Sequence, residues 1–139
     1  MVRSGPWKRV DRAVWKGRAR NARDFLATAR NELELAEEGA NGNPIMSLIV
    51  LSAIAFADAL TIKYGGIQNT QDHAAIVKTM KHAMGNRVDR GQLKRLGQIV
   101  AKKPVAQYDF RASTIEEAGS LFEQLIRFSE WAEVELSRP

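Results

Sequence analysis

The fold is decided by one long apolar stretch, NPIMSLIVLSAIAFADALTIK (residues 43–63). Asn43-Pro44 is typical of a helix start, because Asn is a preferred N-cap and Pro at the first helical position gives up no needed hydrogen bond. The stretch is apolar on nearly all sides, and such a helix is normally covered by neighbours all round. Its apolar run, residues 45–57, is too short to cross a membrane. We therefore expect a central helix inside a soluble bundle, stopped by Tyr64-Gly65-Gly66.

Long helices are expected on both sides of this stretch. Apolar positions upstream recur in alternating steps of four and three residues, which predicts a helix over 15–38 that ends before Gly39. Near the end of the chain, Thr114 and Glu117 fit a capping box. The same apolar spacing follows them, so a last helix is expected over 114–136.

The segment between the central and last helices is expected to hold two shorter helices. One is predicted over 70–84, with its cap at residue 69 or 70. The other is predicted over 89–103, begun by the cap Asp89 and terminated by Pro104. Residues 105–112 are expected to form a loop or a short extended piece.

These elements define an all-α fold. No stretch alternates with period two for long enough to predict a strand. A chain of 139 residues is expected to form one domain. Short turns favour antiparallel neighbours, so we predict an up-and-down bundle of four to five helices over residues 1–139, with residues 1–10 as a flexible basic arm.

The composition excludes several classes of site. The chain has no Cys, which excludes disulfides, thiolate zinc sites, iron–sulfur clusters and cysteine nucleophiles. Only His73 and His82 are present, so a histidine-rich metal site is excluded as well. We predict no metal and no cofactor. Residues 1–7 show no secretory signal, and the expected location is the cytoplasm, without a membrane.

The net charge of +5 is unevenly distributed. Residues 1–30 have a net charge of +7, residues 63–111 also +7, and residues 112–139 have −4. One interpretation is a surface for nucleic acid or an acidic partner, since Lys and Arg gain affinity by releasing phosphate counterions. The other is that the basic first helix pairs with the acidic last helix. The candidate basic surface consists of Arg9, Arg12, Lys16, Arg18, Arg20 and Arg23.

Asp58 and His73 are the candidate site residues within the helices. Asp58 lies inside the apolar central helix, where a carboxylate is costly unless it is paired. It is either a pocket acid, beside Lys63, His73 or a basic loop residue, or it faces a solvated seam or forms one structural contact. His73 stands near a helix start, which favours a contact at the helix cap over a role as ligand or base.

The order of elements resembles the HEPN superfamily (higher eukaryotes and prokaryotes nucleotide-binding), a group of small helical bundles. The resemblance covers residues 20–136. It is carried by the stretch ARNELELA (29–36), the small-residue helix SLIVLSAIAFADAL (47–60), Asp72-His73 followed by Ile76, and KPVAQYDF (103–110) before the last helix. The last of these stands where the family usually carries its ribonuclease motif of Arg and His.

The motif itself is degenerate. Lys103 takes the place of the Arg, Pro104 that of the polar residue and Gln107 that of the His, while Tyr108 and the adjoining Ala106 fit the pattern. Gln has no acid or base chemistry near neutral pH, so RNA cleavage should be absent. Lys103 keeps the ability to hold a phosphate as a point charge, without a bidentate fork.

The resemblance implies a homodimer and a binding role rather than catalysis. Our leading hypothesis is a non-catalytic HEPN-like module for a nucleotide, RNA or a partner protein, such as a nucleotidyltransferase or a toxin–antitoxin-type partner. One alternative is a degenerate metal-independent ribonuclease, in which His73 or Tyr108 replaces the missing His. The other is an assembly protein that docks an acidic partner through its Arg-rich first helix, which predicts no pocket at residues 103–108. The candidate binding residues are Asp58, His73, Lys94, Arg95, Lys102, Lys103, Gln107 and Tyr108.

Overall fold

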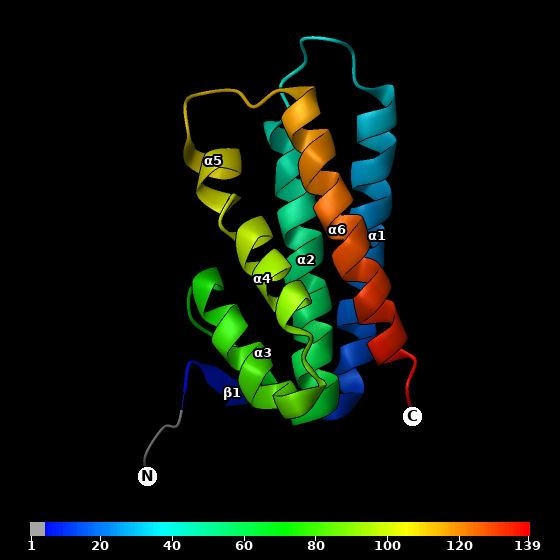
Figure 1. Cartoon of the computed structure of the whole chain (residues 1–139), viewed down its shortest axis with the longest axis vertical. Helices are drawn as coiled ribbons and strands as arrows, with labels where there is room; N and C mark the ends of the chain where they lie inside the picture. The colour runs from blue at the N-terminus through cyan, green and yellow to red at the C-terminus, as the bar shows by residue number, and fades with distance from the viewer. Residues whose placement is uncertain (1–4) are drawn as a thin grey trace.

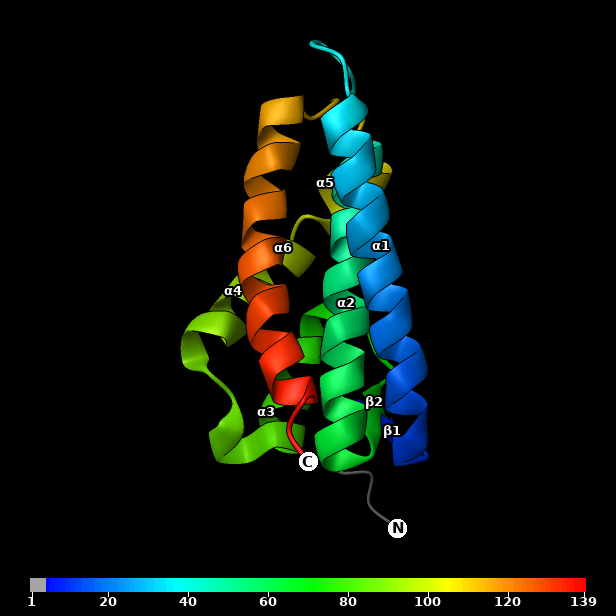
Figure 2. The same ribbon diagram turned by 90° about the vertical axis from the view of Figure 1, so that its right-hand side faces the viewer.

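The computed structural model describes residues 5–139 and has an all-α architecture (Figure 1). Three long helices lie side by side, and three shorter helices cover one side of the central helix α2 (Figure 2). The chain ascends in α1, descends in α2, ascends through α4 and α5, and descends in α6, which confirms the predicted bundle. The helices are α1 (Trp15–Leu35), α2 (Asn43–Gly65), α3 (Ile76–Met84), α4 (Arg90–Val100), α5 (Lys103–Tyr108) and α6 (Ile115–Leu136).

Helix α2 is the core of the bundle. Every residue from Ser52 to Ile62 is buried, including Phe56 with 1% exposure. Helices α1, α3, α4, α5 and α6 all contact it. Of the described helices it alone is long and apolar enough to cross a membrane, yet 83% of its most apolar window is buried inside the protein. Its apolar surface is therefore used for packing against the other helices, as the sequence predicts.

Several predicted helix ends are confirmed. The Thr114 hydroxyl accepts a hydrogen bond from the Glu117 amide, and the Glu117 carboxylate accepts one from the Thr114 amide, which completes the capping box. Asp89 caps α4 by accepting from the amide of Gln92. Gly66 ends α2 in the left-handed conformation, at φ 63°, which a residue with a Cβ atom adopts only at a cost.

Other predicted boundaries are wrong by a few residues. Helix α1 ends at Leu35 rather than near residue 38, and Gly39 takes its positive φ in the turn beyond. Asn43 is the first residue of α2, after the N-cap Gly42. Its side chain instead joins the loop before α6, donating to the Arg111 carbonyl and accepting from the Ser113 amide.

Two short strands are present that the sequence did not predict. Trp7–Arg9 (β1) pairs antiparallel with Ile67–Asn69 (β2). Strands of three residues are too short to show a period-two pattern. The Trp7 ring stacks on His82, with ring centroids 4.3 Å apart. Part of the predicted N-terminal arm thus packs against the bundle, and its first four residues lie outside the described residues.

The segment between α3 and α6 also differs from the prediction. Helix α3 follows a 3-10 turn, His73–Ala75, whose cap is Asp72 rather than residue 69 or 70. Helix α4 ends at Val100, and Pro104 lies in the first turn of the short helix α5. Residues 105–108 are therefore helical, because the fixed φ of proline suits the start of a helix as well as the end of one.

Candidate functional site

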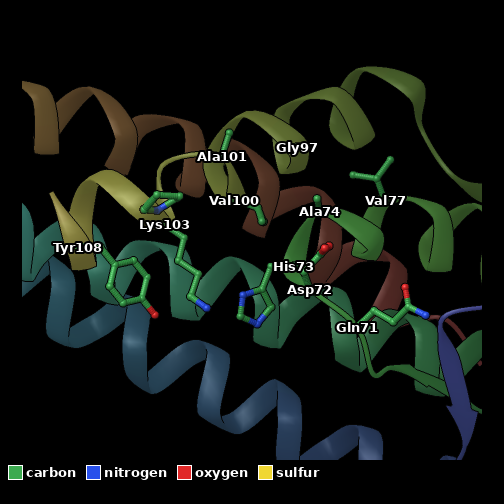
Figure 3. A pocket seen from close by; sticks show the side chains of 11 residues that line it. Gln71, Asp72, His73, Ala74, Val77, Gly97, Val100, Ala101, Lys103 and Tyr108 are labelled. Atoms are coloured by element: carbon green, nitrogen blue, oxygen red, sulfur yellow. The ribbon is translucent and has the colours of Figure 1, made fainter.

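A hollow lies between the start of α3 and the end of α4 with α5 (Figure 3). It has a volume of about 640 Å³. Small and apolar side chains form most of its wall, and a few polar side chains stand around them. We call it the apolar chamber; it is lined by Gln71, Asp72, His73, Ala74, Val77, Gly97, Val100, Ala101, Lys103, Pro104 and Tyr108.

Lys103 is the cation of the apolar chamber. It is the first residue of α5, and its neighbour Pro104 lies in the first turn of that helix. Ala106 of the same helix is buried against α2, which fixes the direction of α5. The Lys103 side chain extends toward the ring of His73 (Figure 3). No carboxylate of residues 5–139 forms an ion pair with it, so its charge is available to a ligand.

His73 faces the same space from the turn before α3. Burial lowers the pKa of His73 below its ordinary value, and the nearby Lys103 ammonium lowers it further, against a smaller opposing effect of Asp72. The imidazole is therefore neutral at neutral pH. The Asp72 carboxylate accepts a hydrogen bond from the Ala75 amide, 3.1 Å away, as the cap of the 3-10 turn.

Tyr108 stands at the rim of the apolar chamber. It is the last residue of α5, and 71% of it is exposed. Its ring lies on the same side of α5 as the Lys103 side chain (Figure 3). Gln107, its neighbour in the chain, is exposed and does not line the chamber. Of the degenerate motif, Lys103, Pro104 and Tyr108 therefore line the apolar chamber, whereas Gln107 does not.

A second hollow, of about 350 Å³, lies beside the first and contains Asp58. The two share His73 and Gln71 in their linings. Its lining residues come from elements far apart in the sequence, namely α1, α2, and β2 with the segment that follows it. We call it the polar chamber; it is lined by Arg18, Asn21, Phe25, Leu51, Ile54, Asp58, Gln68, Asn69, Thr70, Gln71 and His73.

Asp58 is buried, and its partner is Arg18 of α1. The Arg18 Nη2 atom lies 3.0 Å from Asp58 Oδ2, and the Gln68 amide donates to the same oxygen at 3.5 Å. Burial raises the pKa of Asp58, and Arg18 and Gln68 oppose that rise without cancelling it. Lys63, one of the expected partners, instead donates to the backbone carbonyls of Leu136 and Arg138.

Three of the predicted binding residues lie away from both chambers. Lys94 is exposed on α4. Arg95 donates to the side-chain oxygens of Gln124, at 2.8 Å, and Gln92, at 3.0 Å. Lys102 lines a separate depression between α4 and α6. With Gln107, these residues do not contribute to the space that His73, Lys103 and Tyr108 share.

The predicted basic surface is partly used within the protein. Arg18 pairs with Asp58, and Arg23 binds both carboxylate oxygens of Glu133 in α6 at 2.7 Å. Arg12 donates to the backbone carbonyl of Lys63. Pairing of the first helix with the last is thus present at Arg23. Arg9, Arg12, Lys16 and Arg20 are exposed and form no ion pair with residues 5–139.

The polar chamber contains residues that the sequence did not single out, chiefly amides and Phe25. A weak signal for them exists. Arg18, Asn21 and Phe25 recur in steps of three and four along α1, which places them on one helix face. Leu51, Ile54 and Asp58 follow the same spacing on α2. Nothing in the sequence indicates that these two faces meet.

Within residues 5–139, no group of three His, Asp or Glu side chains is arranged to hold a metal ion. No known protein-family model matches this chain, and no curated protein sequence matches it either.

Proposed function

We propose that this protein is a non-catalytic, HEPN-like binding module whose apolar chamber takes a nucleotide or a short segment of RNA. The observation that carries the proposal is the position of Lys103. Its charged side chain reaches into a mostly apolar hollow and is paired with no carboxylate of the described residues.

The chemistry of the chamber fits a nucleotide. Ligand sites are typically apolar hollows in which a few polar groups fix the orientation of the ligand. Val77, Val100 and Pro104 offer apolar surface to a sugar or base, and Lys103 offers a point charge to a phosphate. The exposed ring of Tyr108 at the rim is available for stacking on a base.

The residue in the place of the motif's His supports a binding role. Gln107, which replaces the His of the resembling family, is exposed and outside the chamber. A glutamine amide neither accepts nor releases a proton near neutral pH. The structural role of Asp58, paired with Arg18, leaves it poorly placed as a catalytic acid.

The test is binding of a labelled single-stranded RNA hexamer to the full chain at low salt, measured by fluorescence anisotropy. Lys103→Glu should weaken binding at least about tenfold, because one charge-assisted contact is lost and a repulsive charge is added. Lys94→Glu is the matched control, since Lys94 is exposed and lines neither chamber. Equal affinity of wild type and Lys103→Glu would overturn the proposal.

The degenerate ribonuclease is the second candidate, and one observation favours it. His73, neutral because of its lowered pKa, lines the same chamber as Lys103 and Tyr108. A neutral imidazole is a competent general base. Cleavage of RNA in the presence of a chelator, abolished by His73→Ala or Tyr108→Phe, would establish this activity in place of simple binding.

An assembly protein that docks an acidic partner has less support. That hypothesis predicts no pocket at residues 103–108, whereas a hollow lies there, and Arg18 and Arg23 are engaged within the chain. Homodimerisation, a nucleotidyltransferase or toxin–antitoxin-type partner and a cytoplasmic location complete the proposal. The first two follow from the resemblance alone, and the third is consistent with a chain without Cys. Light scattering after gel filtration tests the dimer.

A further inference from the structure

The polar chamber contains hydrogen-bonding groups that the fold does not use. Asp58 Oδ2 accepts from Arg18 and Gln68, whereas Oδ1 accepts no hydrogen bond from residues 5–139. The side-chain amides of Asn21 and Gln71 also line the chamber. Neither makes a hydrogen bond to another described side chain, so they remain free to donate or accept.

The walls of the polar chamber suit a flat, neutral group. The ring of Phe25 on α1 and the side chains of Leu51 and Ile54 on α2 supply apolar surface. Arg18 and Asp58 carry opposite charges, and His73 is neutral at neutral pH, so the chamber has no net charge. A nucleobase has this character, with aromatic faces that stack on apolar or aromatic side chains and an edge that forms hydrogen bonds.

The free oxygen of Asp58 selects among the bases. A carboxylate only accepts hydrogen bonds, so it favours a base with an exposed exocyclic amino group, as on cytosine, adenine or guanine. Uracil has no amino group, and its single N–H lies between two carbonyl oxygens that repel a carboxylate. The chamber should therefore hold cytosine more tightly than uracil.

The two chambers adjoin at two residues that line both of them. Both are lined by His73 and Gln71, and the Lys103 side chain extends toward His73 at their border (Figure 3). A phosphate held by Lys103 beside His73 would therefore lie near both chambers. Two successive nucleotides of a single strand have this arrangement, with a linking phosphate between two bases.

We propose that the polar chamber is a base-reading subsite, in which Asp58 binds the amino group of a base in single-stranded RNA whose neighbouring phosphate lies on Lys103. This inference rests on the function proposed above and adds the class of ligand and the residue that discriminates between bases.

The experiment compares labelled hexamers of cytidylate and uridylate, bound to the full chain and measured by fluorescence anisotropy. The wild type should bind the cytidylate hexamer at least about tenfold more tightly. Asp58→Asn should remove most of this preference, because its amide presents a donor as well as an acceptor. Leu51→Trp should remove it independently, by filling the chamber from a position that is 37% exposed.

Two controls separate the subsite from the rest of the protein. Leu35→Trp adds the same bulk at an exposed position outside both chambers and should leave the preference unchanged. Circular-dichroism melting checks that each variant is folded. If Asp58→Asn is unfolded, the base preference of Leu51→Trp alone tests the subsite.

The outcomes distinguish the two proposals. Equal binding of both hexamers, weakened in both by Lys103→Glu, would overturn the subsite and leave the binding function intact. A preference that survives both Asp58→Asn and Leu51→Trp would also overturn the subsite. No binding of either hexamer to the wild type at low salt would overturn the binding function itself, and the subsite with it.

Discussion

The ion pair between Arg18 and Asp58 is expected to stabilise the fold, and a single substitution can test this. Asp58 is 5% exposed, whereas about a third of the Arg18 side chain is open to solvent. Arg18→Ala leaves the buried carboxylate without its strongest partner. We expect the free energy of unfolding at pH 7 to fall by roughly 1–3 kcal/mol, less than for a fully buried pair because of that exposure. Denaturant titration measures this loss, and Arg20→Ala, an exposed neighbour, should cost far less.

The pH dependence of that loss follows from the raised pKa of Asp58. A carboxyl group with a higher pKa in the folded than in the unfolded state reduces stability as the pH rises above its ordinary value. Removal of Arg18 raises this pKa further. The cost of Arg18→Ala should therefore be full at neutral pH and shrink toward pH 4. An equal cost at both pH values would show that the pair contributes through packing alone.

Individual residues of the candidate site were only partly predictable. Lys103 and Tyr108 were found through a resemblance in the motif, and both line the apolar chamber. The burial of Asp58 follows from its apolar surroundings in the sequence. Its partner does not, because Arg18 is 40 residues away and many other cations were available. The local sequence pattern shows that a carboxylate is buried at an energetic cost. Only the tertiary structure shows which residue pairs with it.

At the scale of elements, the close approach of Gly42 to the start of α6 gives a direct test of packing. A Cβ atom on Gly42 would lie 2.4 Å from the Thr114 carbonyl oxygen. Gly42→Ala must therefore displace the start of α6, and we expect a loss of about 1–3 kcal/mol in the free energy of unfolding.

Gly119, which lies within α6, is the matched control. A Cβ atom there meets no atom within 4 Å, so Gly119→Ala should stabilise the protein by about 0.5–1 kcal/mol through helix propensity. Chemical denaturation of both variants measures the difference. Equal changes in the free energy of unfolding would show that the start of α6 moves away from residue 42 without loss of stability.

Length decides which elements the sequence predicts. Helices α1, α2 and α6 span several turns each, so their apolar spacing is unambiguous. Helix α5 has six residues and the two strands three each, too few to establish any period. The short elements also shape the chambers, since α5 carries Lys103 and β2 carries Gln68. The part of the fold that forms the site is thus the part with the weakest signal in the sequence.

The whole molecule has a net charge of +5, and two of its Arg side chains on α1 form ion pairs with other helices. Arg23 is bound to Glu133 across α1 and α6, and Arg18 to Asp58 across α1 and α2. Two Lys or Arg side chains line the apolar and polar chambers, Arg18 and Lys103. Of these, Lys103 has no carboxylate partner among the described residues. Binding of RNA should therefore depend on few charges rather than on the full net charge.

The salt dependence of binding measures how many charges take part. For single-stranded nucleic acid, the logarithm of the binding constant falls with the logarithm of salt concentration by about 0.7 for each neutralised phosphate. A contact through Lys103 alone gives the cytidylate hexamer a slope close to −0.7, and Lys103→Glu should flatten it. A slope several times steeper would instead assign the RNA to the exposed residues Arg9, Lys16 and Arg20. In that event the double variant Arg9→Glu with Arg20→Glu, rather than Lys103→Glu, would reduce the slope.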